Sequence, residues 1–344
     1  MTMTAFFADE ERPHYPAHFL VNGNFEPNPE HPERVDRLLT GARAAGCTIK
    51  RPAEFGLAPI LALHDPRYVA FLETAYERWK RIDGASAAVT PNIHPVSRDN
   101  HYPDSIVAQA GWHLLDASAP VAAYTYESAC WSAWSAVAAA QCVLAGERAA
   151  YALARPPGHH ARQDAAAGFC YFNNSAIAAQ TLRAEHDRVV ILDVDLHHGN
   201  GTQDIFYDRD DVLTVSIHAD PSRFYPFFWG AEDETGRGAG QGFNVNLPLA
   251  RGSADDIFLA ALDKAVARIG AFNPGAIVIA LGLDASEHDP FGGLRVSTKG
   301  FERIGAAISA AFSGPAVLVQ EGGYLCDALG DNLAAFLSGF SSNS

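Results

Sequence analysis

The chain has 344 residues, 48% of them hydrophobic, so it is long enough to bury a large core. Its formal net charge of −15 argues against nucleic acid and anionic membrane surfaces as partners, because both are themselves negative, and it suits a cationic substrate. The five cysteines lack C-x-x-C spacing, which favours reduced thiols in a cytoplasmic protein, and no apolar run approaches the ~20 residues of a membrane span.

Strand-like and helix-like stretches alternate along nearly the whole chain, without a repeat or a linker between them. In chain order, the expected strands are Thr4–Ala8, Ala149–Ala154, Val189–Leu192, Leu213–Ile217, Ala276–Leu281 and Ala316–Gln320. The expected helices are Glu33–Ala45, Asp65–Trp79, Ser128–Leu144, Asn173–Ala184, Ala254–Ile269, Thr298–Phe312 and Ala328–Phe340. This alternation predicts one α/β domain over residues 1–344, built on a central, mostly parallel sheet flanked by helices on both faces.

Two segments interrupt this pattern. Arg12–Pro32 is rich in Pro, Asn and His and shows no periodicity, and Ala85–Tyr102 is rich in turn-forming residues. Loops of this length inside a compact domain are usually functional or disordered. We therefore expect both segments to be long surface loops and to build the mouth of a binding site.

The stretch Val189–Thr202 carries the strongest chemical signal. Its apolar, β-branched opening is typical of a buried central strand in a parallel sheet, and acids and histidines follow at once. Because side chains alternate along a strand, Asp193, Asp195 and His197 are expected to point to the same side. Burying such groups unpaired is costly, and a divalent cation relieves that cost with ordinary zinc ligands. The alternative interpretation is a solvated turn.

Polar residues also follow the other predicted strands. The residues at these strand ends are His159 and His160, Asp195 and His197, His218, Asp284, and Glu321–Tyr324. Taken singly, each set is as well explained by a turn, a cap or a packed side chain. Their regular placement at the same end of successive strands predicts an active site at one edge of the sheet.

Together these residues meet the needs of metal-assisted amide hydrolysis. Asp195, His197 and Asp284 offer three metal ligands and leave a fourth position for water. The two adjacent histidines titrate near neutral pH, as a general base must. The phenol of Tyr324 can donate to a developing oxyanion.

The chain also resembles a known family through the segments RPPGHHA, GFCYFNN, DVDLHHGNGTQ, LGLDA and EGGY. In this order they are similar to the signature segments of the zinc-dependent histone deacetylase and acetylpolyamine amidohydrolase superfamily. The resemblance covers nearly the whole chain, and DPSRFYPFFWGAEDETGRGAG looks most like the bacterial acetylpolyamine amidohydrolase branch. It implies a single-domain arginase/deacetylase fold.

The resemblance also implies roles for individual residues. The implied catalytic set is His159, His160, Tyr324, Asp193 and Asn200, and the implied zinc ligands are Asp195, His197 and Asp284. The implied tunnel walls are Gly168, Phe169 and Tyr225, with Arg34 near an internal acetate exit. The implied sites for K⁺ or Na⁺ are, first, Asp193, Asp195, His197, Ser216 and Ile217 and, second, Phe206, Arg209, Val212 and Phe243.

Two positions depart from the family pattern. Asn200 stands behind the expected base His160, where eukaryotic members carry Asp, and a neutral amide should leave this imidazole less basic. Val107 occupies a position that is acidic in typical acetylpolyamine amidohydrolases. Asp104 and Asp116 lie nearby in the sequence and are the candidates to replace that charge at the substrate mouth.

We therefore expect an amidohydrolase that removes acetyl groups from polyamines or related small cationic amines. Zn²⁺ is the expected metal, with Fe²⁺ as the alternative because relative affinity alone does not select the metal in cells. A restricted mouth favours a homodimer. Two other hypotheses stay open at this point: a deacetylase of protein or peptide lysines, and an inactive protein that only binds acetylated ligands.

Overall fold

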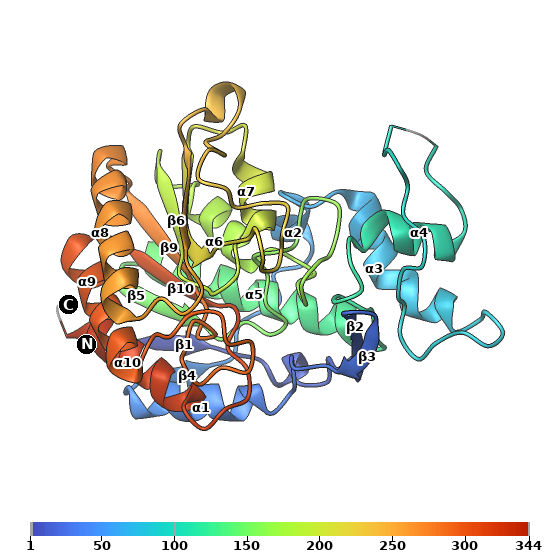
Figure 1. The fold of residues 1–344 in the computed structure, drawn as a ribbon, viewed down its shortest axis with the longest axis horizontal. Helices are drawn as coiled ribbons and strands as arrows, with labels where there is room; N and C mark the ends of the chain where they lie inside the picture. The colour runs from blue at the N-terminus through green and yellow to red at the C-terminus, as the bar shows by residue number, and fades with distance from the viewer. Residues whose placement is uncertain (1–2, 100, 343–344) are drawn as a thin grey trace.

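The computed structural model describes residues 3–99 and 101–342. Its centre is an eight-stranded sheet of order β4-β1-β5-β10-β9-β6-β7-β8 in which every neighbouring pair is parallel. The strands are β1 Thr4–Phe6, β4 Thr48–Lys50, β5 Ala149–Ala152, β6 Val189–Asp193, β7 Val212–Ala219, β8 Asn244–Leu249, β9 Ala276–Leu281 and β10 Ala316–Gln320. The predicted α/β fold with helices on both faces is confirmed (Figure 1).

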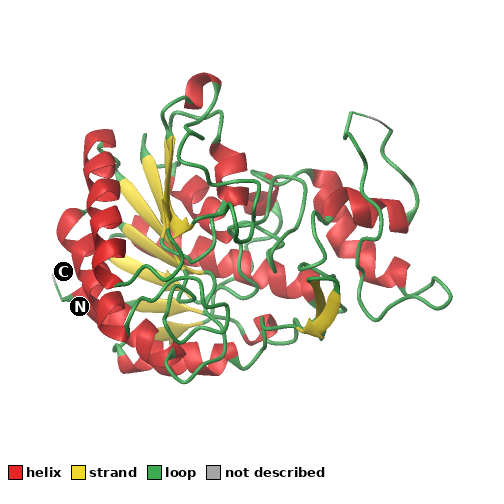
Figure 2. Ribbon diagram, viewed as in Figure 1, coloured by secondary structure: helices red, strands yellow, loops and turns green. Residues whose placement is uncertain are grey.

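The α-helices are distributed over the two faces of the sheet and one lobe beside it (Figures 1 and 2). One face carries α1 Arg34–Ala44, α8 Asp255–Phe272, α9 Thr298–Ala311 and α10 Leu329–Ser341. The other carries α5 Thr125–Leu144, α6 Asn174–Leu182 and α7 Asn200–Phe206. The lobe contains α3 Pro66–Trp79 and α4 Ile106–His113, with the short α2 Ala58–Leu61 nearby. None of the helices in the described part of the chain is long and apolar enough to cross a membrane.

Strand β6 shows why the sheet is buried on both sides. Val190 and Leu192 pack into the core beneath α8, α9 and α10, whereas Val189 and Ile191 pack into the core beneath α5 and α6. Period-two alternation therefore sends apolar side chains to two separate cores, so the strand must be apolar throughout. Its last residue, Asp193, opens the polar segment at the carboxyl edge.

The structure corrects the expectation of an irregular loop over Arg12–Pro32. This segment contains a two-stranded antiparallel hairpin, β2 His18–Val21 and β3 Asn24–Pro27. Its turn residues Asn22 and Gly23 both have positive φ, 51° and 79°, as a tight hairpin requires. In the other predicted loop, Asn100 lies outside the described residues, and the described part of 85–102 forms neither helix nor regular strand.

Several elements were missed by the sequence patterns. The edge strands β4 and β8 are three and six residues long, and β8 contains two Asn and a Pro, which only an edge or irregular position tolerates. Helix α7 lies in a Gly-containing segment that lacks helical periodicity, and α4 has only eight residues. Helix α5 begins at Thr125 instead of the expected Ser128.

Candidate active site and metal centre

Three predicted metal ligands converge at the carboxyl edge of the sheet. Asp195 and His197 follow β6, Asp284 follows β9, and all three are buried, with one potential ligand atom from each within 4.8 Å of the others. The Nδ1 atom of His197 lies 3.2 Å from Asp195 Oδ1 and 3.1 Å from Asp284 Oδ2. Two elements far apart in the chain therefore contribute to one small polar cluster.

Two glycines leave the space that these carboxylates occupy. A Cβ on Gly282 would lie 2.1 Å from Asp195 Oδ2, and one on Gly322 would lie 2.2 Å from Asp284 Oδ2. The peptide N–H of Gly322 donates to Asp195 Oδ2 at 2.8 Å, which orients that carboxylate. Any larger residue at either position would displace a ligand.

The donor set fits a divalent cation. Burial disfavours a protonated imidazole, yet hydrogen bonds and charges from Asp195 and Asp284 outweigh burial and raise the pKa of His197 to about 9. Even with His197 protonated, the two carboxylates of the cluster outnumber its one imidazolium, so the net charge of these three residues favours a cation. One nitrogen and two carboxylate oxygens are the donor types of a catalytic zinc-type site, which keeps a further position for water.

His159 is paired with a carboxylate. Its Nδ1 lies 2.9 Å from Asp193 Oδ2, and its Nε2 faces Asp195 Oδ1 at 3.8 Å. Burial favours the neutral ring, but the charges of Asp195 and Asp193 raise the pKa of His159 well above its usual value. These charges favour a protonated imidazole at His159, beside the predicted metal ligands.

His160 has the opposite character. Burial, followed by the positive charges of His159 and His197, lowers its pKa well below the usual value. Its Nδ1 lies 2.6 Å from the amide oxygen of Asn200, which can only accept, so Nδ1 carries the proton. The lone pair then resides on Nε2, and this neutral imidazole has the protonation state that a general base needs.

The variant Asn200→Asp tests that assignment. A carboxylate stabilises imidazolium more than an amide does, so the pKa of His160 should rise, by about one unit or more. Because hydrolysis requires neutral His160, the acidic limb of the pH profile of kcat/KM should then shift to higher pH. The exposed Asn273→Asp is the matched control. An acidic limb that stays in place would exclude His160 as the observed base.

Aromatic side chains from two segments flank the cluster. The Phe169 ring lies 5.8 Å from the Tyr324 ring, and the Tyr225 ring lies 5.0 Å from that of His160. Gly168 has φ 51°, and a Cβ there would lie 2.4 Å from His160 and 2.8 Å from the Tyr225 hydroxyl. The absence of a side chain at Gly168 is therefore what lets both neighbours approach. The predicted wall residues are brought together.

Tyr324 follows β10 and is buried at the same edge. The guanidinium of Arg34 lies 4.9 Å from the centre of its ring. Arg34 also donates to the carbonyls of Gly323 at 2.5 Å and Glu321 at 2.8 Å, so it holds the turn that carries the tyrosine. Arg34 thus lies next to the proposed oxyanion donor, and its expected place near an acetate exit stays a prediction.

Asp116 and Asp104 occupy different places. Asp116 accepts hydrogen bonds from the Tyr225 hydroxyl at 2.6 Å, the Gly168 peptide at 3.2 Å and the Ser118 peptide at 2.8 Å. It therefore connects Gly168 with Tyr225, two of the predicted wall residues. Asp104 is exposed just before α4, in the lobe away from the strand ends (Figure 1).

The departure at position 107 has a structural context. Val107 lies on α4 and packs against the hydrophobic core that this helix shares with α3 and α5. An apolar residue suits that packing. Asp104 and Asp116 are consequently not equivalent replacements, since only Asp116 contacts the predicted wall residues Gly168 and Tyr225.

Some residues of each predicted monovalent-cation site lie close together. Ser216 pairs with Asp193 in the β6–β7 register, and Ile217 is the next residue of β7. Phe206 and Val212 share a hydrophobic core at the end of α7 and the start of β7, and the Arg209 peptide donates to the Phe206 carbonyl. Ion binding at these places stays a prediction.

His218 was predicted at the active-site edge of the sheet from its position at a strand end, but its hydrogen bonds indicate a structural role. Its Nδ1 lies 2.8 Å from Ser216 Oγ, and its Nε2 lies 3.0 Å from the Gly230 carbonyl. Burial lowers its pKa to about 4, so the ring is neutral at neutral pH. It supports the loop after β7, which also carries Tyr225.

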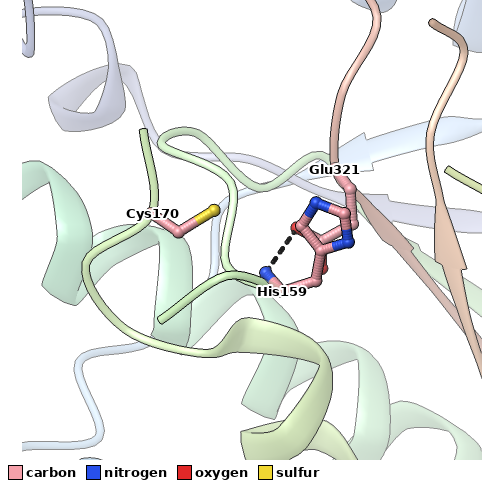
Figure 3. A group of neighbouring side chains, drawn as sticks. All are labelled: His159, Cys170 and Glu321. Carbon is pink, nitrogen blue, oxygen red and sulfur yellow. Dashed lines mark hydrogen bonds between the residues drawn. The ribbon is translucent and has the colours of Figure 1, made fainter. Parts of the chain in front are cut away.

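Sequence patterns assigned no role to Glu321, although it lies directly against His159. Figure 3 shows it with His159 and Cys170, whose ligand-type atoms lie within 4.8 Å of one another. Its carboxylate accepts from the Gly158 peptide at 2.6 Å, the His159 peptide at 3.0 Å and Ser175 Oγ at 2.6 Å. Glu321 thus fixes the backbone of His159. An acid directly before two glycines was the available signal.

Comparison with known proteins agrees with this geometry. The family model described as "Histone deacetylase domain" matches residues 28–340. The chain is 47% identical over 340 residues to the acetylpolyamine amidohydrolase of Burkholderia pseudomallei, covering 98% of each protein. It is 42% identical over 343 residues to acetylpolyamine amidohydrolase 1 of Pseudomonas aeruginosa, covering 98% of this chain and 99% of that one.

A solved structure is equally similar. The crystal structure of acetylpolyamine aminohydrolase from Burkholderia pseudomallei superimposes with a TM-score of 0.96 at 46% identity, and 99% of each chain is covered. Sequence and fold therefore agree over nearly the whole length. The chain therefore belongs to the histone deacetylase domain family.

Proposed function

We propose that this protein is a metal-dependent amidohydrolase that removes acetyl groups from N-acetylated polyamines or related small amines. The observation that carries the proposal is the convergence of a three-residue ligand cluster, a neutral His160 and the Tyr324 phenol at one sheet edge. Full-length similarity to proteins named acetylpolyamine amidohydrolase supports the substrate class.

The ligand cluster would hold the metal ion that activates the substrate. Asp195, His197 and Asp284 would hold Zn²⁺ or Fe²⁺, and such an ion supplies Lewis-acid polarisation of the acyl carbonyl and of the attacking water. Nε2 of His160 accepts the proton that the water loses. The hydroxyl of Tyr324 donates to the carbonyl oxygen as negative charge develops there.

The departing amine needs a proton before it can leave. The amine nitrogen takes a proton from His160 or from His159, whose ring centroids are 4.0 Å apart, before the C–N bond breaks. His159 keeps its positive charge against Asp193 and so favours the anionic intermediate electrostatically. The Phe169 and Tyr225 rings exclude water from the methylene linker of the substrate. We also propose K⁺ or Na⁺ at the two predicted cation sites.

Exposed aromatic residues at the rim support a homodimer whose second subunit restricts the mouth. Phe19 of the β2–β3 hairpin packs 5.5 Å from Phe169, so the hairpin borders the tunnel. On this hairpin Phe25 is 71% exposed, and beyond Tyr225 the chain exposes Phe228 at 87%. Large exposed aromatic side chains of this kind are typical of association surfaces. A monomer by sedimentation at assay concentrations would refute the dimer.

Substrate length separates this proposal from its rival, a deacetylase of protein lysines. We expect kcat/KM for acetylputrescine, acetylcadaverine or acetylspermidine to exceed that for an acetyl-lysine peptide by at least ~10-fold, the equivalent of ~1.4 kcal/mol lost at the rim. Equal rates would favour the protein deacetylase. A metal-loaded protein that hydrolyses none of them would favour a binding protein. The five free cysteines suit a reducing compartment, which we propose to be the cytoplasm.

A further inference from the structure

Asp289 lies on the loop after β9 and is buried, with 6% of its surface exposed. It is followed by Pro290 and Phe291. Its Oδ2 accepts a hydrogen bond from the peptide N–H of Tyr324 at 2.9 Å, and its Oδ1 accepts one from the peptide N–H of Phe291, also at 2.9 Å. One carboxylate therefore joins the loop after β9 to the turn after β10.

The two peptides that Asp289 holds carry rings that touch each other. The Phe291 ring lies 4.8 Å from the Tyr324 ring and 5.4 Å from the ring of the metal-cluster residue His197. On another side of Tyr324 lies the guanidinium of Arg34. Asp289 thus sets both the backbone of Tyr324 and the ring that separates it from His197.

The turn beneath Tyr324 depends on such anchors. Gly323 has φ 114°, a backbone conformation that residues other than glycine rarely adopt. A Cβ at this position would lie 2.8 Å from Leu283. Glycine is also the most flexible residue, so the turn needs outside contacts to hold one conformation. Arg34 binds the carbonyl of Gly323, and Asp289 binds the N–H of the next residue.

We propose that Asp289 is a positioning residue that holds the Tyr324 phenol at the proper distance from the metal cluster. The inference rests on the role of Tyr324 in the proposed function. It differs from that function because Asp289 itself touches no reacting atom. Its effect on hydrolysis must therefore pass through Tyr324.

The test is a double-mutant cycle with Asp289→Asn and Tyr324→Phe in the metal-loaded enzyme. The side chain of asparagine can accept only one of the two hydrogen bonds from the peptide N–H groups, because its NH₂ group faces the other N–H and repels it. Because a misplacement of ~1 Å can cost ~10²-fold in rate, we expect kcat to fall by roughly 10–10²-fold, with KM and metal content nearly unchanged. In the Tyr324→Phe background the same change should cost less than ~2-fold.

Asp65→Asn is the matched control. Asp65 also precedes a proline and accepts from the peptide N–H two residues on, that of Arg67, at 2.7 Å, but it caps α3 in the lobe. Its substitution should leave kcat unchanged. If Asp289→Asn does not accumulate as folded protein, Phe291→Leu in both backgrounds asks the same question through the ring contact.

The outcomes separate the two proposals. Equal losses in both backgrounds, a loss confined to KM, or a loss of metal would overturn the positioning role of Asp289 while leaving the proposed function intact. Wild-type turnover of the Tyr324→Phe single variant would instead overturn the role of Tyr324, and with it this inference. A loss of kcat that vanishes without the phenol supports both.

Discussion

Replacing Asp284 by alanine should abolish both metal retention and amide hydrolysis. Asp284 is the only residue of the ligand cluster that comes from the β9 side, and it faces His197 Nδ1 at 3.1 Å. Its loss leaves two ligands, both from the segment after β6. Losing even a residue that merely supports a ligand costs ~10–100-fold in metal affinity, so losing a ligand should cost more.

Elemental analysis and turnover of the purified variant measure both effects. Asp263→Ala is the control, because it removes an exposed carboxylate from α8 on the outer face of the sheet. It should bind as much metal as the unaltered protein. An active, metal-replete Asp284→Ala variant would refute the ligand assignment, and a folded, metal-free, inactive one is the expected result. A melting curve distinguishes loss of metal from loss of fold.

Replacing Tyr324 by phenylalanine should lower kcat by about 10²–10³-fold, the usual loss when one oxyanion donor is removed. The phenol is buried beside the predicted metal ligands, and burial raises its pKa well above the usual value, which favours the protonated, hydrogen-bond-donating form. The ring contacts with Phe291 and Phe169 survive in the variant, so the fold should be retained.

Tyr68→Phe is the matched control for that measurement. Tyr68 is equally buried, and its hydroxyl donates to the Tyr171 carbonyl at 2.6 Å, away from the ligand cluster. Its substitution should lower stability but leave kcat intact. Metal content should be unchanged in both variants. Full turnover by Tyr324→Phe would show that the phenol has no part in stabilising the oxyanion.

The sequence alone determined the fold class and the chemistry at the sheet edge, because both follow from local patterns. The four consecutive apolar residues that open β6 indicate a strand that is buried on both faces of the sheet. The abrupt change to Asp193, Asp195 and His197 places ligand-type groups directly at the carboxyl end of that strand. A parallel sheet then collects every such strand end at one edge, so the ligand cluster was predictable before its distances were known.

Some local elements were beyond the sequence patterns for an equally physical reason. The hairpin β2–β3 is short, and its strands lack the alternation that marks a strand with one buried face, since only Phe19 is buried. Strand β8 is held by its pairing with β7, not by propensity. Such elements owe their form to neighbours that the local sequence does not contain.

Only the tertiary structure decided which groups support the site. Asp116 meets Tyr225 across 109 residues, Glu321 meets Gly158 across 163, and Asp289 meets Tyr324 across 35. In the sequence, an acid bound to a distant peptide looks the same as a solvated one. These carboxylates are identified by the donors that folding brings to them, because a buried acid persists only where hydrogen bonds compensate for the water it loses.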